Sequence, residues 1–209
     1  MNRLIFILNF LISLISFSQD FEGLISYTIT HTSLDSSINE IASMPTKLDF
    51  YISGELARID QSTKIGTQTT IIDTLLNRNI LLINLMDKKF GIILNDNDTN
   101  YLENIIYIDE SEDFLGIECK KAVMNSINKK TNRSTTSTIY YTNKIDNSYN
   151  INFKKLKGFP IYYEIISDNI ISTYLAVEII NKNINPKIFE IDNNTSIYKM
   201  EEFRALMTQ

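Results

Sequence analysis

The side chains that most often carry catalysis or bind metal ions are scarce in this sequence. There is one histidine, His31, and one cysteine, Cys119. A hydrolytic triad or a Cys–His pair needs a histidine base beside its nucleophile, and these two residues lie far apart in the chain. A zinc site needs several Cys or His ligands. We therefore expect no catalytic residue, metal site or cofactor, unless His31 lies within hydrogen-bonding distance of a serine, a threonine or Cys119.

Two acidic stretches are candidate cation sites. Asp96–Asn100 begins like a calcium-binding loop, but its sixth position is Tyr101, where that loop needs glycine, and its twelfth is Tyr107 instead of glutamate. A solvated hairpin loop is the better interpretation. The run Asp109–Asp113 could hold a weakly bound cation, although acidic loop edges of this kind are commonly just solvated. No glycine-rich phosphate loop is present.

The single cysteine rules out an internal disulfide. Cys119 follows the same alternation as Ile117 and Val123 along a stretch with the pattern of a strand. A reactive thiol would need a lowered pKa, and the only histidine is distant in the sequence. We expect Cys119 to be a buried small hydrophobic residue, not a redox or nucleophilic one.

The N-terminus has the pattern of a secretory signal peptide. Arg3 precedes the apolar run Leu4–Phe17, and Ser16 and Ser18 supply small side chains three and one residues before a cut. The run is too short and too interrupted by polar residues to span a bilayer. No cysteine follows the cut, which argues against a lipid-anchored N-terminus. We expect removal of the signal and a periplasmic or secreted protein.

The expected organisation is a signal peptide at 1–18 followed by one domain at 19–209. The mature chain of about 190 residues is long enough for a genuine core. Lys and Arg number 20 against 25 Asp and Glu, a net charge of −5, and 44% of the residues are hydrophobic. This balance disfavours nucleic acid as a partner, because phosphate binding needs basic clusters. It also disfavours electrostatic attachment to anionic lipid.

Hydrophobic residues recur with a period of two, which predicts a mainly β protein. Turn-forming residues such as Asn77–Asn79 and Asp113–Gly116 separate the candidate strands. Many short strands at hairpin spacing indicate a single curved antiparallel sheet of about ten strands, a half-barrel. The candidates are Ile25–His31, Leu48–Ile52, Leu56–Asp60, Thr69–Thr74, Ile80–Leu85, Lys89–Leu94, Ile105–Asp109, Ile117–Ser126, Ser134–Thr142, Ile161–Ser167 and Ile171–Ile180.

Two or three short helices are expected on the concave side of this sheet. Leu34, Ile38, Ile41 and Met44 form a helical apolar stripe, which Ser37 and Glu40 could cap and Pro45 would end. Shorter helices are expected at Ile151–Leu156, before Gly158, and at Met200–Met207. None is long enough to form a bundle, so each must pack on the sheet.

The strands carry more apolar surface than one solvated sheet needs. In the last one, Ile171, Thr173, Leu175, Val177 and Ile179 make an almost wholly apolar face. A concave face covered by helices, or one that lines a cavity, would account for the surplus.

Several short motifs, taken together, resemble a known family over nearly the whole mature chain. The motifs are Phe21–Tyr27, Tyr51–Arg58, Gly116–Ala122, Tyr140–Thr142, Leu156–Tyr163, Phe189–Ile191 and Met200–Phe203. In this order and spacing they resemble an uncharacterised secreted Bacteroidota family, the domain-of-unknown-function 4412 group. Asp192 departs from the pattern, since that family usually has proline there.

The resemblance implies a fold similar to LolA and LolB, the periplasmic lipoprotein carriers. In those proteins an incomplete barrel under short helices shields acyl chains from water. Such carriers use a strand arginine near the lid to hold the closed state, and Arg58 is the candidate for that position here. A surface arginine paired with Asp60 or with a neighbouring carboxylate is the alternative. Because the family has no established activity, the carrier role is an analogy at the level of the fold.

The leading hypothesis is a non-enzymatic binding protein for a lipid or a lipoprotein acyl chain held under a helical lid. Each buried CH₂ would contribute roughly 0.8 kcal/mol, so no fixed polar partner is required. The expected ligand-binding residues are apolar ones on concave strand faces, together with Arg58: Tyr27, Ile29, Phe50, Ile52, Leu82, Phe90, Ile92, Tyr163, Leu175 and Val177.

The alternative is an envelope structural or protein-interaction module whose half-barrel is filled by its own side chains. It would bind a partner protein and no small ligand. An enzyme ranks third among these hypotheses.

Overall fold

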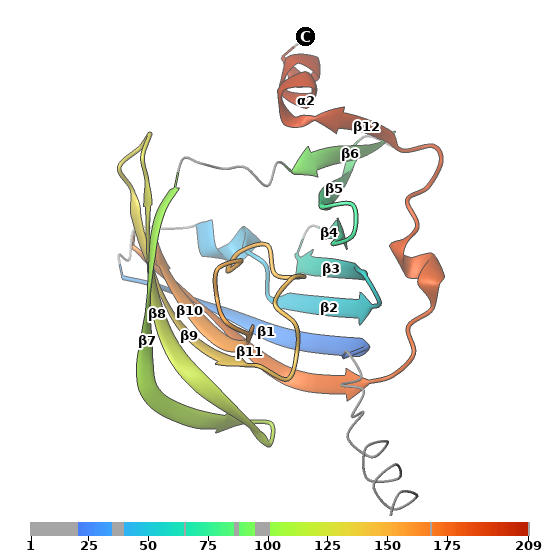
Figure 1. Ribbon diagram of the computed structural model, residues 1–209. Helices are drawn as coiled ribbons and strands as arrows, with labels where there is room; N and C mark the ends of the chain where they lie inside the picture. Colours follow the sequence, from blue (N-terminus) through green and yellow to red (C-terminus); the bar gives the residue numbers. More distant parts are fainter. Residues whose placement is uncertain are drawn as a thin grey trace, which may run out of the picture.

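The computed structural model consists mainly of β-strands. It describes residues 21–34, 40–64, 66–85, 88–94, 101–167 and 169–208. The strands form one twelve-stranded sheet (Figure 1). The expected signal peptide lies outside the described residues. The strands are β1 (Gly23–Ser33), β2 (Lys47–Ser53), β3 (Leu56–Thr63), β4 (Gly66–Asp73), β5 (Arg78–Leu85), β6 (Lys88–Leu94), β7 (Tyr101–Phe114), β8 (Ile117–Asn128), β9 (Ser134–Thr142), β10 (Phe159–Ser167), β11 (Ile170–Asn181) and β12 (Ser196–Lys199).

The sheet consists of two meanders joined side by side. Strands β1 to β6 are consecutive neighbours, as are β7 to β11, and β1 pairs with β11 to join the two sets. All pairs are antiparallel except β12 with β6. The sheet bends so that β7–β9 face β2–β6 across a concave space (Figure 1). Edge strands are β7 at one end and β12 at the other.

The prediction of one curved antiparallel sheet is confirmed, but the strand count of about ten is wrong. Each expected strand overlaps one of β1 to β11, and β9 has the expected bounds. The extra strand is β12, whose four residues are too few to show a period of two. Strand β7 also extends well beyond Ile105–Asp109 at both ends.

One of the three expected helices is confirmed, namely α2 (Met200–Met207). It lies at the end of the sheet beside β6 and β12, where the Phe203 ring is 5.6 Å from that of Phe90 (Figure 1). Within 34–44 the described residues hold only the 3₁₀ turn η1 (Glu40–Ser43), and Leu34 is 63% exposed. Positions 35–39, with Ser37 and Ile38, lie outside the described residues.

The helix expected at Ile151–Leu156 is wrong, because side chains compete for its backbone donors. The Asn150 Oδ1 atom accepts hydrogen bonds from the backbone N–H groups of Asn152 and Phe153. These local bonds replace the intrahelical ones and keep the chain irregular. The segment is part of a loop, residues 143–158, that joins β9 to β10; we name it the inner loop.

The inner loop fills the concave space of the sheet (Figure 1). Four of its side chains belong to the main hydrophobic core with the inward residues of the strands: Ile145, Tyr149, Phe153 and Leu156. Its base is closed at Gly158, where a Cβ atom would collide with the carbonyl of Thr142. The surplus of apolar strand surface is therefore covered by irregular chain, not by helices.

A second segment covers part of the convex face. Residues 182–195, named the strap, connect β11 to β12 and contain the 3₁₀ turn η2 (Pro186–Phe189). Ile71 and Ile80 pair across β4 and β5 on the face opposite to the main core, yet both are buried. Phe189 of the strap is also buried, so this face has a small apolar layer of its own.

Candidate functional site

Five of the predicted ligand-binding residues lie together in the packed core. Tyr27, Ile29, Phe50, Ile52 and Tyr163 are all buried and belong to one cluster. The rings of Tyr27 and Tyr163 are 6.2 Å apart, edge to face. The Tyr27 hydroxyl donates a 2.6 Å hydrogen bond to the carbonyl of Pro160 on β10. These side chains contact one another and the inner loop, so their apolar surface is already covered.

The inner loop is anchored to both halves of the sheet. The Phe153 ring packs edge to face on Tyr163 at 5.1 Å, and the Tyr149 hydroxyl donates to the carbonyl of Gly54 at 2.6 Å. The space left between loop and strands, lined by Tyr27 and Phe50 among others, is about 20 Å³. A space of this size holds about one water molecule, so it cannot hold an acyl chain.

The prediction that Leu175 and Val177 lie on the concave face is wrong. Their side chains are 39% and 48% exposed, on the side of β11 away from the core. The cause is a β-bulge: Ser26 pairs with Glu178 and Tyr27 with Ala176, which leaves Val177 unpaired. A bulge shifts the alternation by one residue. Hydrophobicity alone gives no sign of that shift.

Leu82 and Arg58 are brought together on the convex side, and Phe90 borders the same space, although its pairing with Ile83 places its side chain on the opposite face. With strap residues such as Glu190 and Thr195 they line a cavity of about 210 Å³. Ile92 is buried outside the main core cluster. Phe90 also lines an open cavity of about 710 Å³ beside α2.

Arg58 contacts the strap and not a lid over the concave face. Its Nε atom lies 2.9 Å from Asp60 Oδ1, which confirms the alternative of an arginine paired with this carboxylate. Its Nη1 atom donates a 2.7 Å hydrogen bond to the carbonyl of Ile188 in η2. Thr69 also donates to Asp60, at 2.6 Å, so the ion pair is embedded in a small polar network.

His31 does have a hydroxyl partner. Its Nδ1 atom lies 2.8 Å from Ser172 Oγ, and its Nε2 atom lies 2.7 Å from the carbonyl of Pro45. A carbonyl only accepts, so Nε2 carries the hydrogen and Nδ1 accepts from Ser172. This order of contacts is that of a nucleophile, a base and an orienting acceptor. Ser172 is only 8% exposed, however, and faces His31 directly across β1 and β11. We interpret the pair as a cross-strand bridge.

Cys119 is buried, as predicted. Burial, and secondarily the carboxylate of Asp113, raises the pKa of its thiol to about 11. A thiol with so high a pKa is a poor nucleophile at neutral pH. Within the described residues, no cluster of three or more His, Cys, Asp or Glu side chains could hold a metal ion. The run Asp109–Asp113 lies in β7, and Asp96–Asn100 lies outside the described residues.

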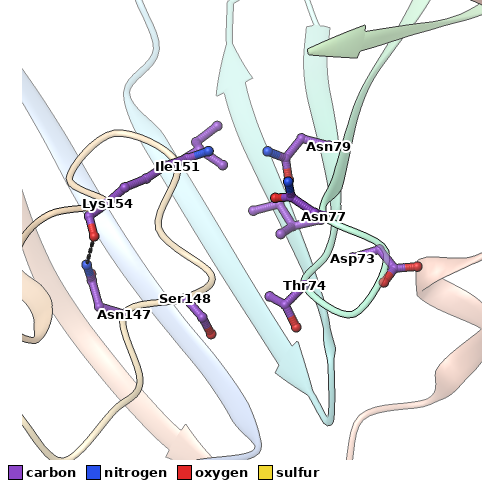
Figure 2. A pocket seen from close by; sticks show the side chains of 9 residues that line it. Asp73, Thr74, Asn77, Asn79, Asn147, Ser148, Ile151 and Lys154 are labelled. Carbon is purple, nitrogen blue, oxygen red and sulfur yellow. Dashed lines mark hydrogen bonds between the residues drawn. The ribbon is translucent and has the colours of Figure 1, made fainter. Parts of the chain in front are cut away.

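A polar pocket, which the sequence did not suggest, lies where the inner loop meets the β4–β5 hairpin. Its volume is about 150 Å³. Figure 2 shows side chains of the hairpin facing side chains of the inner loop across this space. The lining residues are Ile72, Asp73, Thr74, Asn77, Asn79, Asn147, Ser148, Ile151 and Lys154.

Asn147 has a central place in this pocket wall. Its Nδ2 atom donates to the carbonyls of Phe153 at 2.8 Å and Leu156 at 3.0 Å, which fixes the orientation of the amide. Its Oδ1 atom is buried and has no hydrogen-bond partner among the described residues. An unpaired buried acceptor costs about 1–3 kcal/mol.

The comparisons with known proteins inform the fold only. No protein-family model matches the chain, and no curated protein matches it. The chain is similar to the solved structure of PNGF-II, with a TM-score of 0.57 and 13% sequence identity over 90% of this chain. It spans 34% of the PNGF-II chain, about a third of its length. At this identity the likeness extends to the architecture of a curved β-sheet and no further.

No helix among the described residues has the length and apolarity needed to cross a membrane.

Proposed function

We propose that this protein is a non-enzymatic, periplasmic or secreted protein-interaction module with a half-barrel filled by its own inner loop. The proposed localisation depends on the expected signal peptide. The proposed family, a secreted Bacteroidota family with a LolA-like fold, depends on the resemblance of the sequence motifs. The observation that carries it is the packing of the inner loop onto the concave face, which leaves about 20 Å³ there. A carrier would need that space for its cargo.

The edge strand β7 supports a specific mode of interaction. It is fourteen residues long and, among the residues that the structure describes, it pairs with β8 alone, so its other side presents backbone groups that no described strand pairs. Leu102 and Ile106 on this strand are 59% and 51% exposed and share one face. A bulge between Ile108 and Ser111 disturbs the second half, whereas Tyr101–Ile108 is regular. An added strand fits best against that first half.

The partner is expected to be an extended, basic segment of another envelope protein. Beyond the regular half, β7 carries four carboxylates between Asp109 and Asp113, and only Glu110 has an ion pair in the described chain, with Lys121 at 2.6 Å. A strand with apolar residues facing Leu102 and Ile106, followed by Lys or Arg, would match both halves. Charge complementarity of this kind mainly sets specificity and association rate.

A second candidate is a binding protein for an apolar ligand, as in the leading sequence hypothesis but at another place. The open cavity of about 710 Å³ beside α2 is lined by Phe90, Tyr198, Leu206 and Met207, together with Lys88 and polar residues. Its volume is in the range of small-molecule sites. A lipid bound there would leave the inner loop undisturbed.

Site-specific photo-crosslinking in the native host separates these candidates. A photoreactive amino acid in place of Leu102 is expected to form one dominant adduct, mapped to a basic extended segment. The same amino acid in place of Leu75, exposed on the β4–β5 turn, should form none. Ile106→Lys should abolish the adduct without loss of folding, since lysine discourages edge pairing. Equal adducts at both positions, or lipid found bound by native mass spectrometry, would overturn the interaction proposal.

A further inference from the structure

The face of β7 that is turned toward the inner loop differs in chemistry from the face that carries the exposed apolar residues. On this side, Glu103 Oε2 lies 3.0 Å from the Nζ atom of Lys155 in the inner loop. The ring of Tyr107 packs edge to face at 5.9 Å on Tyr141, a member of the main core. Side chains alternate along a strand, so a strand added beside β7 would meet an apolar face on one side and a charged face on the other.

Lys157 provides the positive charge on this face that lacks an opposite partner. Its Nζ atom lies 4.5 Å from the centroid of the Tyr107 ring, and the Tyr107 hydroxyl donates to the carbonyl of Lys155 at 3.4 Å. Lys157 is exposed, and none of the ion pairs within the described chain includes it. An ammonium group that contacts only an aromatic ring can still bind a carboxylate.

A strand added to β7 would bring one of its side chains next to this ammonium group. Residues directly opposite each other in neighbouring strands have their Cβ atoms about 5 Å apart. The residue opposite Tyr107 would therefore lie alongside the ring that carries Lys157. Residues opposite Leu102 and Ile106 would point to the other face of the sheet.

From these contacts we infer that the partner strand carries an Asp or Glu opposite Tyr107, and that Lys157 is the residue that selects it. The inference rests on the proposed function, since it concerns a strand bound to β7. The partner would then have apolar residues on one face, one carboxylate on the face toward the inner loop, and basic residues beside Asp109–Asp113. A basic side chain opposite Tyr107 would instead face a like charge.

The same contact would fix the register of the added strand. A slip by one residue turns every side chain to the other face, and a slip by two keeps the faces but moves the carboxylate away from Lys157. In one direction such slips bring it toward Asp109, and in the other toward Glu103, both of which are like charges. One unpaired cation between two acidic positions therefore disfavours the alternative registers.

Photo-crosslinking from position Leu102 in the native host provides the readout, with three variants compared. Lys157→Glu should lower the adduct yield about tenfold, because repulsion replaces attraction. Lys157→Arg keeps the charge and the contact with the Tyr107 ring, and should stay within about twofold of the parent. Lys187→Glu, at an exposed position on the strap, changes the net charge equally and should leave the yield unchanged. Thermal melting followed by circular dichroism should show that all three variants are folded.

A charge reversal in the partner completes the test. Mass spectrometry maps the adduct, and the Asp or Glu of the mapped segment is changed to Lys. This partner variant should lose the adduct with the parent protein and regain it with Lys157→Glu. A mapped segment without a carboxylate, parent-level yield with Lys157→Glu, or loss without restoration would overturn the inference and leave strand addition standing. No adduct at Leu102 in the parent protein would overturn both.

Discussion

Among single residues, we interpret the contact between His31 and Ser172 as structural, although its geometry resembles that of a catalytic pair. The histidine connects β1 to β11 through Ser172 and to the segment before β2 through the carbonyl of Pro45. Each polar atom of the pair thereby has a partner, as buried polar groups require. Acyl transfer would also need an exposed hydroxyl and donors for an oxyanion, and the buried Ser172 offers no such access.

A structural bridge and a catalytic pair respond differently to a covalent probe. We expect a fluorophosphonate probe to leave Ser172 unlabelled in the folded protein. Ser172→Ala should lower the free energy of unfolding by about 1–2 kcal/mol, because the acceptor nitrogen of His31 loses its partner. Denaturant unfolding and intact-protein mass spectrometry measure the two effects. Labelling that Ser172→Ala removes would establish the enzyme hypothesis instead.

Cys119 allows a second test at this scale. Its thiol pKa of about 11 lies about two units above the ordinary value of 9.0, so at pH 8 the thiolate fraction is about 100-fold lower. Complete burial adds a steric barrier to that chemical one. We expect negligible reaction with Ellman's reagent in the folded protein at pH 8, and one rapidly reacting thiol in urea. Fast reaction of the native protein would contradict the burial of Cys119.

Among the elements, the strap is attached to β3 through one charged side chain, that of Arg58. Arg58 reaches from β3 to η2 through the Ile188 carbonyl and is paired with Asp60. Two hydrogen bonds between residues three apart define η2: Ile188 N–H donates to the Asn185 carbonyl, and Glu190 N–H donates to the Lys187 carbonyl. A 3₁₀ turn this short has little stability of its own, so its order depends on the contacts with β3.

Arg58→Ala is therefore expected to loosen the strap. The free energy of unfolding should fall by about 1–2 kcal/mol, since a half-buried charged hydrogen bond is lost. Amide hydrogen exchange at Ile188 and Glu190 should become faster than in the parent protein. Arg58→Lys should restore only part of the lost stability, because an ammonium group lacks the forked N–H donors of a guanidinium, which reach Asp60 and η2 together. Lys47→Ala, which removes the exposed ion pair with Asp49, is the control and should change stability by less than about 0.5 kcal/mol.

The elements that could be predicted from the sequence are those in which one period continues for six or more residues. Strands such as β9 and the amphipathic α2 satisfy this condition, and their bounds agree with the expectation. The errors lie where a single local contact overrides the pattern. Asn150 prevents a helix in the inner loop, and the bulge at Val177 reverses the inward face of part of β11. The polar pocket combines residues from two loops that are distant in the sequence, so no pattern within a single segment could predict it.

At the scale of the whole molecule, the core contains several weak acids that are neutral when protonated. Burial raises the pKa of the Cys119 thiol to about 11 and raises the pKa values of the Tyr27 and Tyr163 hydroxyls further, above their ordinary value of 10.0. The folded chain therefore keeps these protons at a pH at which the unfolded chain releases them. Stability decreases with pH wherever the folded state binds more protons than the unfolded state.

The expected result is a protein that is stable from neutral pH to about pH 9 and then loses stability steeply. Cys119 contributes to the free energy of unfolding in full below its unfolded pKa near 9. This contribution, on the order of 2 kcal/mol, is lost as the pH rises toward 11. The tyrosines extend the loss above pH 10. Urea unfolding at a series of pH values measures the slope, and Cys119→Ala should flatten it between pH 9 and 10 while leaving the steeper loss above. A stability that stays constant from pH 8.5 to pH 11 would mean that these side chains are hydrated in the native state, and with them the face on which the inner loop packs.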